Sequence, residues 1–225
     1  MTWRQEQKYL ISGAQRELLL CRLRAALRPD PFAVCDGLYQ IRTLYFDDIF
    51  DSSLFDTLSG APEREKYRLR MYNSDQSFLR LEKKIKRYGG GQKPDALLTP
   101  EECRSLLRGD YRFLVNRSES FLQKAYADAR AGELKPRCMV DYTRAAFYHE
   151  AGNVRITLDS DVRVNRNTDA FFDEPFVGLP MLENGSSILE VKFDDFLPAF
   201  ISRLIGIGDF PRSAMSKYAA GGVYY

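Results

Sequence analysis

The chain has 225 residues, 44% of them hydrophobic and 13% aromatic, which is enough for one large globular domain over residues 1–225. Its 33 Lys and Arg residues are nearly balanced by 31 Asp and Glu residues, and a net charge of only +2 argues against a nucleic-acid-binding protein. No stretch reaches the roughly 20 apolar residues of a membrane span. The four cysteines are widely separated and include no CxxC pair, which favours reduced thiols in a cytoplasmic protein.

The first half of the chain is predicted to contain four strands and one helix. Ser12 and Gln15 form a capping-box pattern that opens a Leu-rich amphipathic helix. Asn73, Ser74 and Asp75 are typical turn residues, so the strands on either side of them are predicted to form a hairpin. The predicted strands cover residues 4–11, 38–46, 63–72 and 77–87, and the helix ends near Arg28.

The second half begins with helices and then returns to strands. Thr99 can cap a helix that has Pro100 in its first position and Glu102 in its third. A second helix is predicted from about Arg112 to Ala131. Further strands are predicted at 137–148, 153–159 and 187–193, followed by a helix at 195–204.

The segment from Arg64 to Arg70 alternates basic residues with other residues. Since successive side chains of a strand point to opposite faces, Arg64, Lys66, Arg68 and Arg70 are expected to share one face. Four cations in one row repel one another unless an anion lies along them. The segment therefore predicts a binding track for a polyanion.

Three other predicted strands also alternate apolar with ionic residues, namely 78–85, 154–159 and 189–193. Two interpretations are open. The ionic faces can meet water on an ordinary antiparallel sheet, or they can line the interior of a closed barrel whose apolar outer face is covered by the amphipathic helices. The second interpretation predicts a functional anion and a metal inside, because buried charges need partners.

Several short motifs, taken in order, resemble one family over nearly the whole chain. They resemble the VTC domain, the polyphosphate polymerase domain of the vacuolar transporter chaperone complex, which is a member of the CYTH-like triphosphate tunnel metalloenzymes. The motifs are Glu6-Gln7-Lys8-Tyr9, Thr43-Leu44-Tyr45-Phe46-Asp47, the segment 64–70, Leu81-Glu82-Lys83-Lys84, Tyr142-Thr143-Arg144, the segment 155–159, Leu189-Glu190-Val191-Lys192 and Ser216-Lys217-Tyr218.

This resemblance implies an α+β fold, an eight-stranded antiparallel β-barrel tunnel with helices packed on its outer face. It also implies site residues. The expected catalytic cations, around the phosphates of ATP, are Arg68, Arg70, Arg144, Arg155 and Lys192; the expected substrate-binding residues are Lys8, Arg64, Lys66, Lys84, Lys93 and Lys217. The expected ligands of Mg²⁺ or Mn²⁺, which prefer oxygen, are Glu190, then Glu82 and Glu6, with Asp159 a weaker candidate.

The activity implied is transfer of the γ-phosphoryl group of ATP to a growing polyphosphate chain. Related hydrolases carry Glu-x-Glu-x-Lys near the N-terminus, whereas this chain has Arg4, Glu6 and Lys8. Loss of the first acid weakens a second metal site that could activate water, and so favours transfer over hydrolysis. A triphosphatase acting on inorganic triphosphate or nucleotides, and a non-catalytic polyphosphate-binding module, stay open as alternatives. Membrane segments in the family also leave a separate membrane partner open, and the oligomeric state is not predicted.

Overall fold

The computed structural model of the protein describes residues 4–30, 33, 37–87, 90–132, 134–183, 185–206, 208, 210–213 and 215–223. Its helices are α1 (Gly13–Ala26), α2 (Ser52–Leu58), α3 (Pro100–Leu107), α4 (Ser120–Arg130), α5 (Ala199–Ile205) and α6 (Lys217–Val223). The 3-10 helices are η2 (Arg112–Asn116), η3 (Ala151–Asn153) and η4 (Thr168–Phe172).

The strands are β1 (Gln5–Ile11), β2 (Arg28–Pro29), β3 (Leu38–Asp47), β4 (Arg64–Tyr72), β5 (Asp75–Arg87), β6 (Gly90–Gln92), β7 (Asp95–Leu98), β8 (Lys135–His149), β9 (Val154–Asn165), β10 (Leu179–Pro180) and β11 (Ser187–Phe193). They form an 11-stranded sheet of order β1-β11-β9-β8-β3-β4-β5-β6, in which β10 pairs with β9, β2 with β8 and β7 with β5. The architecture is therefore mixed α+β around a large antiparallel sheet, as predicted.

The predicted closure of eight strands into a barrel is wrong. Among the described residues, β1 forms a ladder with β11 alone at one end of the strand order, and its other edge makes a single bridge from Tyr9 to Arg212. At the other end, β6 forms a ladder with β5 alone. The sheet is open because no ladder joins these ends. Alternating polarity determines the face on which a side chain lies, but it does not determine whether the two terminal strands meet.

The chain divides into two compact units. The first comprises residues 1–40, 142–163 and 180–215, and the second comprises residues 41–141, 164–179 and 216–225. The long strands β3, β8 and β9 each contribute residues to both units. The prediction of a single domain over residues 1–225 stays a prediction.

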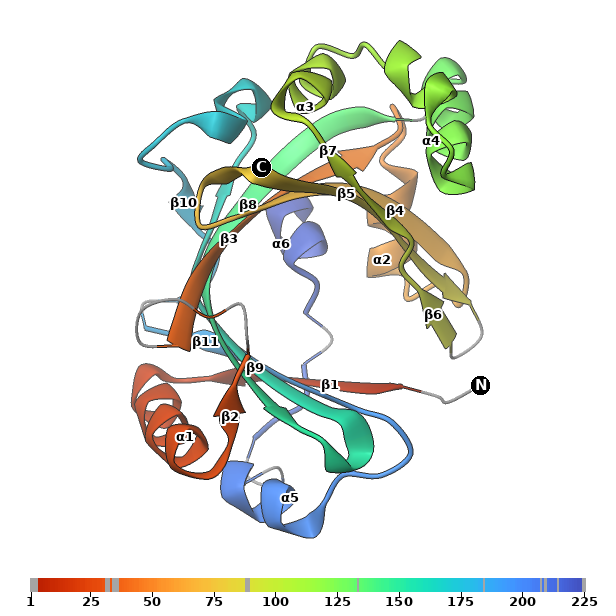
Figure 1. Ribbon diagram of the computed structural model, residues 1–225. Coiled ribbons are helices and arrows are strands. Elements are labelled where there is room, and N and C mark those ends of the chain that lie inside the picture. Colours follow the sequence, from red (N-terminus) through yellow and green to blue (C-terminus); the bar gives the residue numbers. More distant parts are fainter. Residues whose placement is uncertain are drawn as a thin grey trace. The chain divides into compact units, whose positions relative to one another are not determined.

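In the first unit, α1 and α5 pack on one face of the β1-β11-β9 segment (Figure 1). The predicted capping box is present, since the Ser12 hydroxyl accepts from the Gln15 N–H and the Gln15 side chain accepts from the Ser12 N–H. Leu19 and Leu23 of α1 are buried against Val191 and other apolar residues of the strands. The apolar face of these strands is thus the core of this unit.

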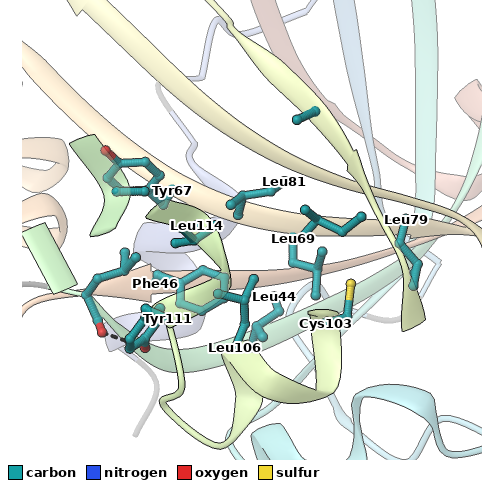
Figure 2. Close-up of a cluster of buried hydrophobic side chains, with 14 of the residues drawn as sticks. Leu44, Phe46, Tyr67, Leu69, Leu79, Leu81, Cys103, Leu106, Tyr111 and Leu114 are labelled. Carbon is teal, nitrogen blue, oxygen red and sulfur yellow. Dashed lines mark hydrogen bonds between the residues drawn. The ribbon is translucent and has the colours of Figure 1, made fainter. Parts of the chain in front are cut away.

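In the second unit, α3, η2 and α4 cover one face of the β4-β5-β7 segment (Figure 1). Figure 2 shows Leu69 and Leu81 of the sheet beside Leu106 of α3 and Leu114 of η2. These four leucines are essentially inaccessible to solvent. The predicted packing of helices on the apolar side of the sheet is confirmed for these three elements.

Several local predictions hold, and others need correction. Strands β4 and β5 form the predicted hairpin, with Asn73 and Ser74 at positive φ in the turn. The helix predicted at 112–131 is instead η2 followed by α4, because Arg117 between them is extended. The helix predicted at 195–204 begins only after Pro198. Helices α2 and α6 were not predicted.

Replacing Leu69 with Ala is expected to lower the free energy of unfolding by about 2–5 kcal/mol, because it leaves a cavity in the core of the second unit. Urea denaturation measures the change. The control is Leu97→Ala on strand β7 of the same unit, since Leu97 is half exposed. Equal losses in the two variants would contradict this account of the core.

Candidate functional site

The basic residues of β4 share one face of the sheet with charged residues of β5. In the register, Arg68 lies opposite Glu82, Arg70 opposite Arg80, and Lys66 opposite Lys84. Leu69 and Leu81 occupy the other face and form core contacts. The predicted row of cations is therefore present, and it continues onto β5. We call this surface of β4 and β5 the ionic face of the second unit.

Glu82 is the centre of this ionic face. Its fully buried carboxylate accepts from Arg68 Nε at 2.6 Å and from Lys93 Nζ at 2.8 Å, and Arg70 Nη1 lies 3.7 Å away. Burial opposes the charge of Glu82, but Arg70, Arg68 and Lys93 outweigh it and hold the pKa of the carboxyl far below its usual range. Glu82 thus fixes three cations, and a metal ion at this carboxylate would have to displace them.

The other expected cations of the second unit lie on β4, β5 and α6. Arg64 Nη1 donates to the Ala61 carbonyl at 2.7 Å, and Lys66 Nζ donates to Thr57 Oγ1 at 2.9 Å. Lys84 is half buried opposite Lys66. Lys217 is the first residue of α6. Arg64 and Lys66 are thus held by groups of residues 57 and 61, whereas Arg68, Arg70 and Lys93 converge on Glu82.

Helix α6 packs against the ionic face, not the apolar one (Figure 1). The ring of Tyr218 stacks on Tyr45, whose Cα partner is Arg68, and Lys66 Nζ lies 5.5 Å from the centre of the Tyr218 ring. The Tyr218 hydroxyl donates to Asp47, and burial together with this carboxylate raises the pKa of Tyr218. Asp47 in turn accepts from the N–H groups at the start of α2. This anchor of α6, next to Lys217, was missed from the sequence.

The first unit has a second ionic face, on β1, β11 and β9. Two rows cross these strands in register: Lys8, Glu190 and Thr157 form one, and Glu6, Lys192 and Arg155 form the next. Side chains in both rows lie on the same face because they are two residues apart along each strand. Three of the expected cations, Lys8, Lys192 and Arg155, therefore lie together with two of the expected carboxylates, Glu190 and Glu6.

Glu190 and Glu6 share two lysines. Lys8 Nζ lies 2.7 Å from Glu6 and 3.5 Å from Glu190, while Lys192 pairs with Glu190 and lies 4.0 Å from Glu6. Burial opposes the charge of Lys8, but Glu190 and Glu6 outweigh it and raise its pKa. The Glu190 side chain is only 9% exposed, so its charge depends on these lysines.

Two arginines of this unit are held by acids. Arg144 makes a bidentate pair with the buried Asp159, with Nε to Oδ1 at 2.6 Å and Nη2 to Oδ2 at 2.8 Å. Arg155 Nη2 lies 2.7 Å from Asp30 and donates to the Tyr39 hydroxyl at 3.2 Å. Asp159 thus orients an arginine, whereas the sequence offered it as a weak metal ligand. Asp30 and Tyr39 were not identified from the sequence.

Two buried polar atoms on this face have no hydrogen-bond partner, Thr157 Oγ1 and Arg155 Nε. Thr157 is 3% exposed and lies beside Glu190 in the register. A buried hydroxyl without a partner carries an uncompensated desolvation cost of about 1–3 kcal/mol. Thr157 was missed from the sequence, although its alternation with Arg155 and Asp159 already placed it on the ionic face.

No group of three or more His, Cys, Asp or Glu side chains in the described ranges is arranged to hold a metal ion by itself. Glu190 and Glu6 are nevertheless brought within reach of the same ammonium groups. One or two carboxylates, completed by substrate phosphates and water, are a typical donor set for Mg²⁺. The oxygen donors of the first unit therefore fit such an ion.

Residues 3–224 match the VTC domain. The chain belongs to this family. The match spans nearly the whole sequence and confirms the family that the motifs indicated. No curated protein is significantly similar to the chain in sequence.

Solved structures support the fold assignment. A candidate adenylate cyclase of Bacillus halodurans is 15% identical, with a TM-score of 0.55 over 94% of this chain and 95% of that one. Protein PH1012 of Pyrococcus horikoshii OT3 is 14% identical, with a TM-score of 0.51 over 96% and 97% of the two chains. At this identity the likeness shows a shared fold. In the part of the chain that the structure describes, no helix combines the length and apolar character needed to span a bilayer.

Replacing Glu82 with Gln is expected to lower the free energy of unfolding at pH 7 by about 3–5 kcal/mol, since it leaves buried arginines without their carboxylate. The pKa of Glu82 is lowered in the folded state, so its contribution is present above about pH 4.5 and is lost as the pH falls further. Urea denaturation at pH 7, 5, 4 and 3 should therefore show that the difference in the free energy of unfolding between wild type and Glu82→Gln becomes smaller below pH 4.5.

The control for this variant is Glu101→Gln, because Glu101 is 80% exposed on α3. It should change the stability by no more than about 0.5 kcal/mol at any of these pH values. If the loss of free energy of unfolding in Glu82→Gln stayed constant down to pH 3, the charge of Glu82 would not be the source of its contribution to stability.

Proposed function

We propose that the protein is a metal-dependent phosphotransferase that moves the γ-phosphoryl group of ATP onto a growing polyphosphate chain. The observation that carries the proposal is the same in each unit: a sheet face rich in cations that are organised around buried carboxylates. Membership of the VTC domain family supports this reading. The proposal includes the phosphate-binding tunnel that the family resemblance implies.

The cations suit phosphate binding because they are held in place before a ligand arrives. Arg68 is positioned by Glu82, Arg144 by Asp159 and Arg155 by Asp30. Groups that are already oriented need little reorganisation when charge develops on phosphate oxygens. Lys8, Lys93 and Lys192 add ammonium groups that also bind phosphate.

A divalent ion would be held by Glu190 with Glu6 and would neutralise charge on the phosphate oxygens when bound. Glu82, in contrast, serves the arginines of the second unit. Thr157 Oγ1 and Arg155 Nε supply hydrogen bonds to a phosphate oxygen on the ionic face of the first unit, which satisfies both atoms.

In the reaction, a terminal phosphate oxygen of the polyphosphate attacks the γ-phosphorus of ATP in line. One P–O bond forms to the chain and the bond to the β,γ-bridging oxygen breaks, so ADP leaves and the chain grows by one phosphate. The attacking oxygen is already anionic at neutral pH, so no dedicated base is required. Such chemistry depends mainly on positioning and charge stabilisation, which suits a site of arginines and lysines.

Arg4 favours transfer over hydrolysis. It occupies the position of the first acid of the hydrolase motif, its side chain is exposed, and its Nη2 lies 3.5 Å from the Asn153 carbonyl. A cation at this position opposes a second metal ion that could activate water. The competing function is a triphosphatase using the same cations.

The deciding experiment incubates the protein with ATP, Mn²⁺ and a pyrophosphate primer and separates the products on a gel. A ladder of lengthening polyphosphate supports the polymerase. Orthophosphate without polymer would identify a triphosphatase, and binding of polyphosphate without ATP turnover would identify a binding module.

Glu190→Gln is expected to reduce metal-dependent ATP turnover by about 100-fold or more, because it removes the main carboxylate offered to the ion. Turnover is measured as ADP release over a range of Mn²⁺ concentrations. The matched control is Glu101→Gln, an exposed acid on α3, the helix that packs on the apolar side of the second unit's sheet. Full turnover in Glu190→Gln would refute the metal assignment.

Thr157→Val is expected to raise KM for the phosphate substrate by about tenfold. The melting temperature should stay the same or rise, because the hydroxyl has no partner to lose in the free protein. Thr157→Ser, which keeps the hydroxyl, should have a KM close to that of the wild type. A fall in melting temperature together with an unchanged KM would assign Thr157 a structural role instead.

A further inference from the structure

A second region of the first unit has the features of a ligand site. It is a cavity of about 400 Å³, a size typical of small-molecule pockets. Its walls are the start of α1, residues 160–163 of β9, and residues 180, 182, 183 and 185–187 at and before the start of β11. Ser187 and Glu190 are three residues apart on β11, so their side chains lie on opposite faces of the strand. The cavity is therefore distinct from the ionic face.

Two buried polar atoms on the cavity wall lack hydrogen-bond partners. Ser187 is 1% exposed and its Oγ has no partner. Arg16 Nε is likewise without a partner, although Arg16 Nη1 pairs with Glu17. Buried donors left unsatisfied are costly, and an acceptor supplied by a ligand would remove that cost.

The amino-terminal end of α1 adds further donors. The N–H groups of Gly13 and Ala14 lie in the first turn of this 14-residue helix, where no intrahelical carbonyl is available to them. The helix dipole also makes this end favourable for an anion. A Cβ on Gly13 would lie 3.1 Å from the Gly185 carbonyl oxygen, so glycine allows the helix end to approach Gly185 closely.

Charge is divided between the inside of the cavity and its rim. The acids that line it, Glu17, Asp161 and Glu183, are exposed, and Asp161 accepts from Arg163 Nε at 2.9 Å. The less exposed part of the wall carries instead the buried Ser187 and Arg16, whose Nε is buried. Acids at the rim repel a polyanion, whereas donors inside can hold a single phosphate group.

Part of the wall is apolar, with Val162, Pro180 and Leu182 facing the cavity. A cavity much larger than a phosphate ion and partly apolar suits an organic group attached to the phosphate. We propose that this cavity binds a small molecule carrying one phosphate group, held by the first turn of α1, Arg16 and Ser187. This site is additional to the phosphotransferase function and does not depend on it.

The test follows backbone amide resonances of the full chain by ¹H–¹⁵N NMR during titration with inorganic phosphate, glycerol 3-phosphate and tripolyphosphate. Saturable shifts at Gly13, Ala14 and Ser187 are expected with the two single-phosphate probes. Tighter binding of glycerol 3-phosphate would identify an organic ester as the ligand, and equal or tighter binding of inorganic phosphate would identify free phosphate. Stronger binding of tripolyphosphate at these amides would overturn the proposal.

Ser187→Ala and Arg16→Gln should each weaken this binding by about tenfold. Arg22→Gln, an exposed arginine on the same helix, is the control and should bind as wild type does. The absence of saturable shifts, or equal affinity in wild type and both cavity variants, would refute the site. The amide resonances of Thr157 and Glu190 report binding at the ionic face of the first unit. A failure of the proposed phosphotransferase site can therefore be distinguished from a failure of the cavity site.

Discussion

Glu82 lies fully buried beneath three cations, and this kind of contact organises both ionic faces. A row of arginines on one strand would repel itself, and a lone buried carboxylate would be strongly destabilising. When the arginines and the carboxylate lie together, their attraction offsets both the repulsion between the arginines and the cost of burying the carboxylate. Asp159 performs the same task for Arg144 in the first unit. The apolar cores behind these faces can then form without leaving uncompensated charge beside them.

The same contacts prepare the cations for a ligand. A guanidinium that is fixed by a carboxylate loses little further side-chain entropy when a phosphate binds, and it keeps its charge at any physiological pH. Lys8 behaves in the same way, since Glu190 and Glu6 raise its pKa. Different acids therefore have different roles. Glu82 and Asp159 stabilise the arginines of the free protein, whereas Glu190 and Glu6 suit a metal ion.

Local features of the chain were predicted well. The capping residues of α1 and α3 and the turn between β4 and β5 depend on neighbours only three or four residues apart. The anchor of α6 could not be predicted in this way, because the bond from Tyr218 to Asp47 joins residues 171 positions apart. The break between η2 and α4 was also missed, since Arg117 binds Glu102 of α3, fifteen residues away, as well as Glu119, two residues away.

The alternation in the strands determined, by itself, which side chains lie on the ionic faces and which form the cores. This follows because a strand turns by half a revolution per residue, whatever it later pairs with. Only the tertiary structure decided which acid holds which cation, that Thr157 and Ser187 are buried without partners, and that the sheet stays open. Those outcomes depend on which strands and helices come together, and contacts between distant segments leave no period in the sequence.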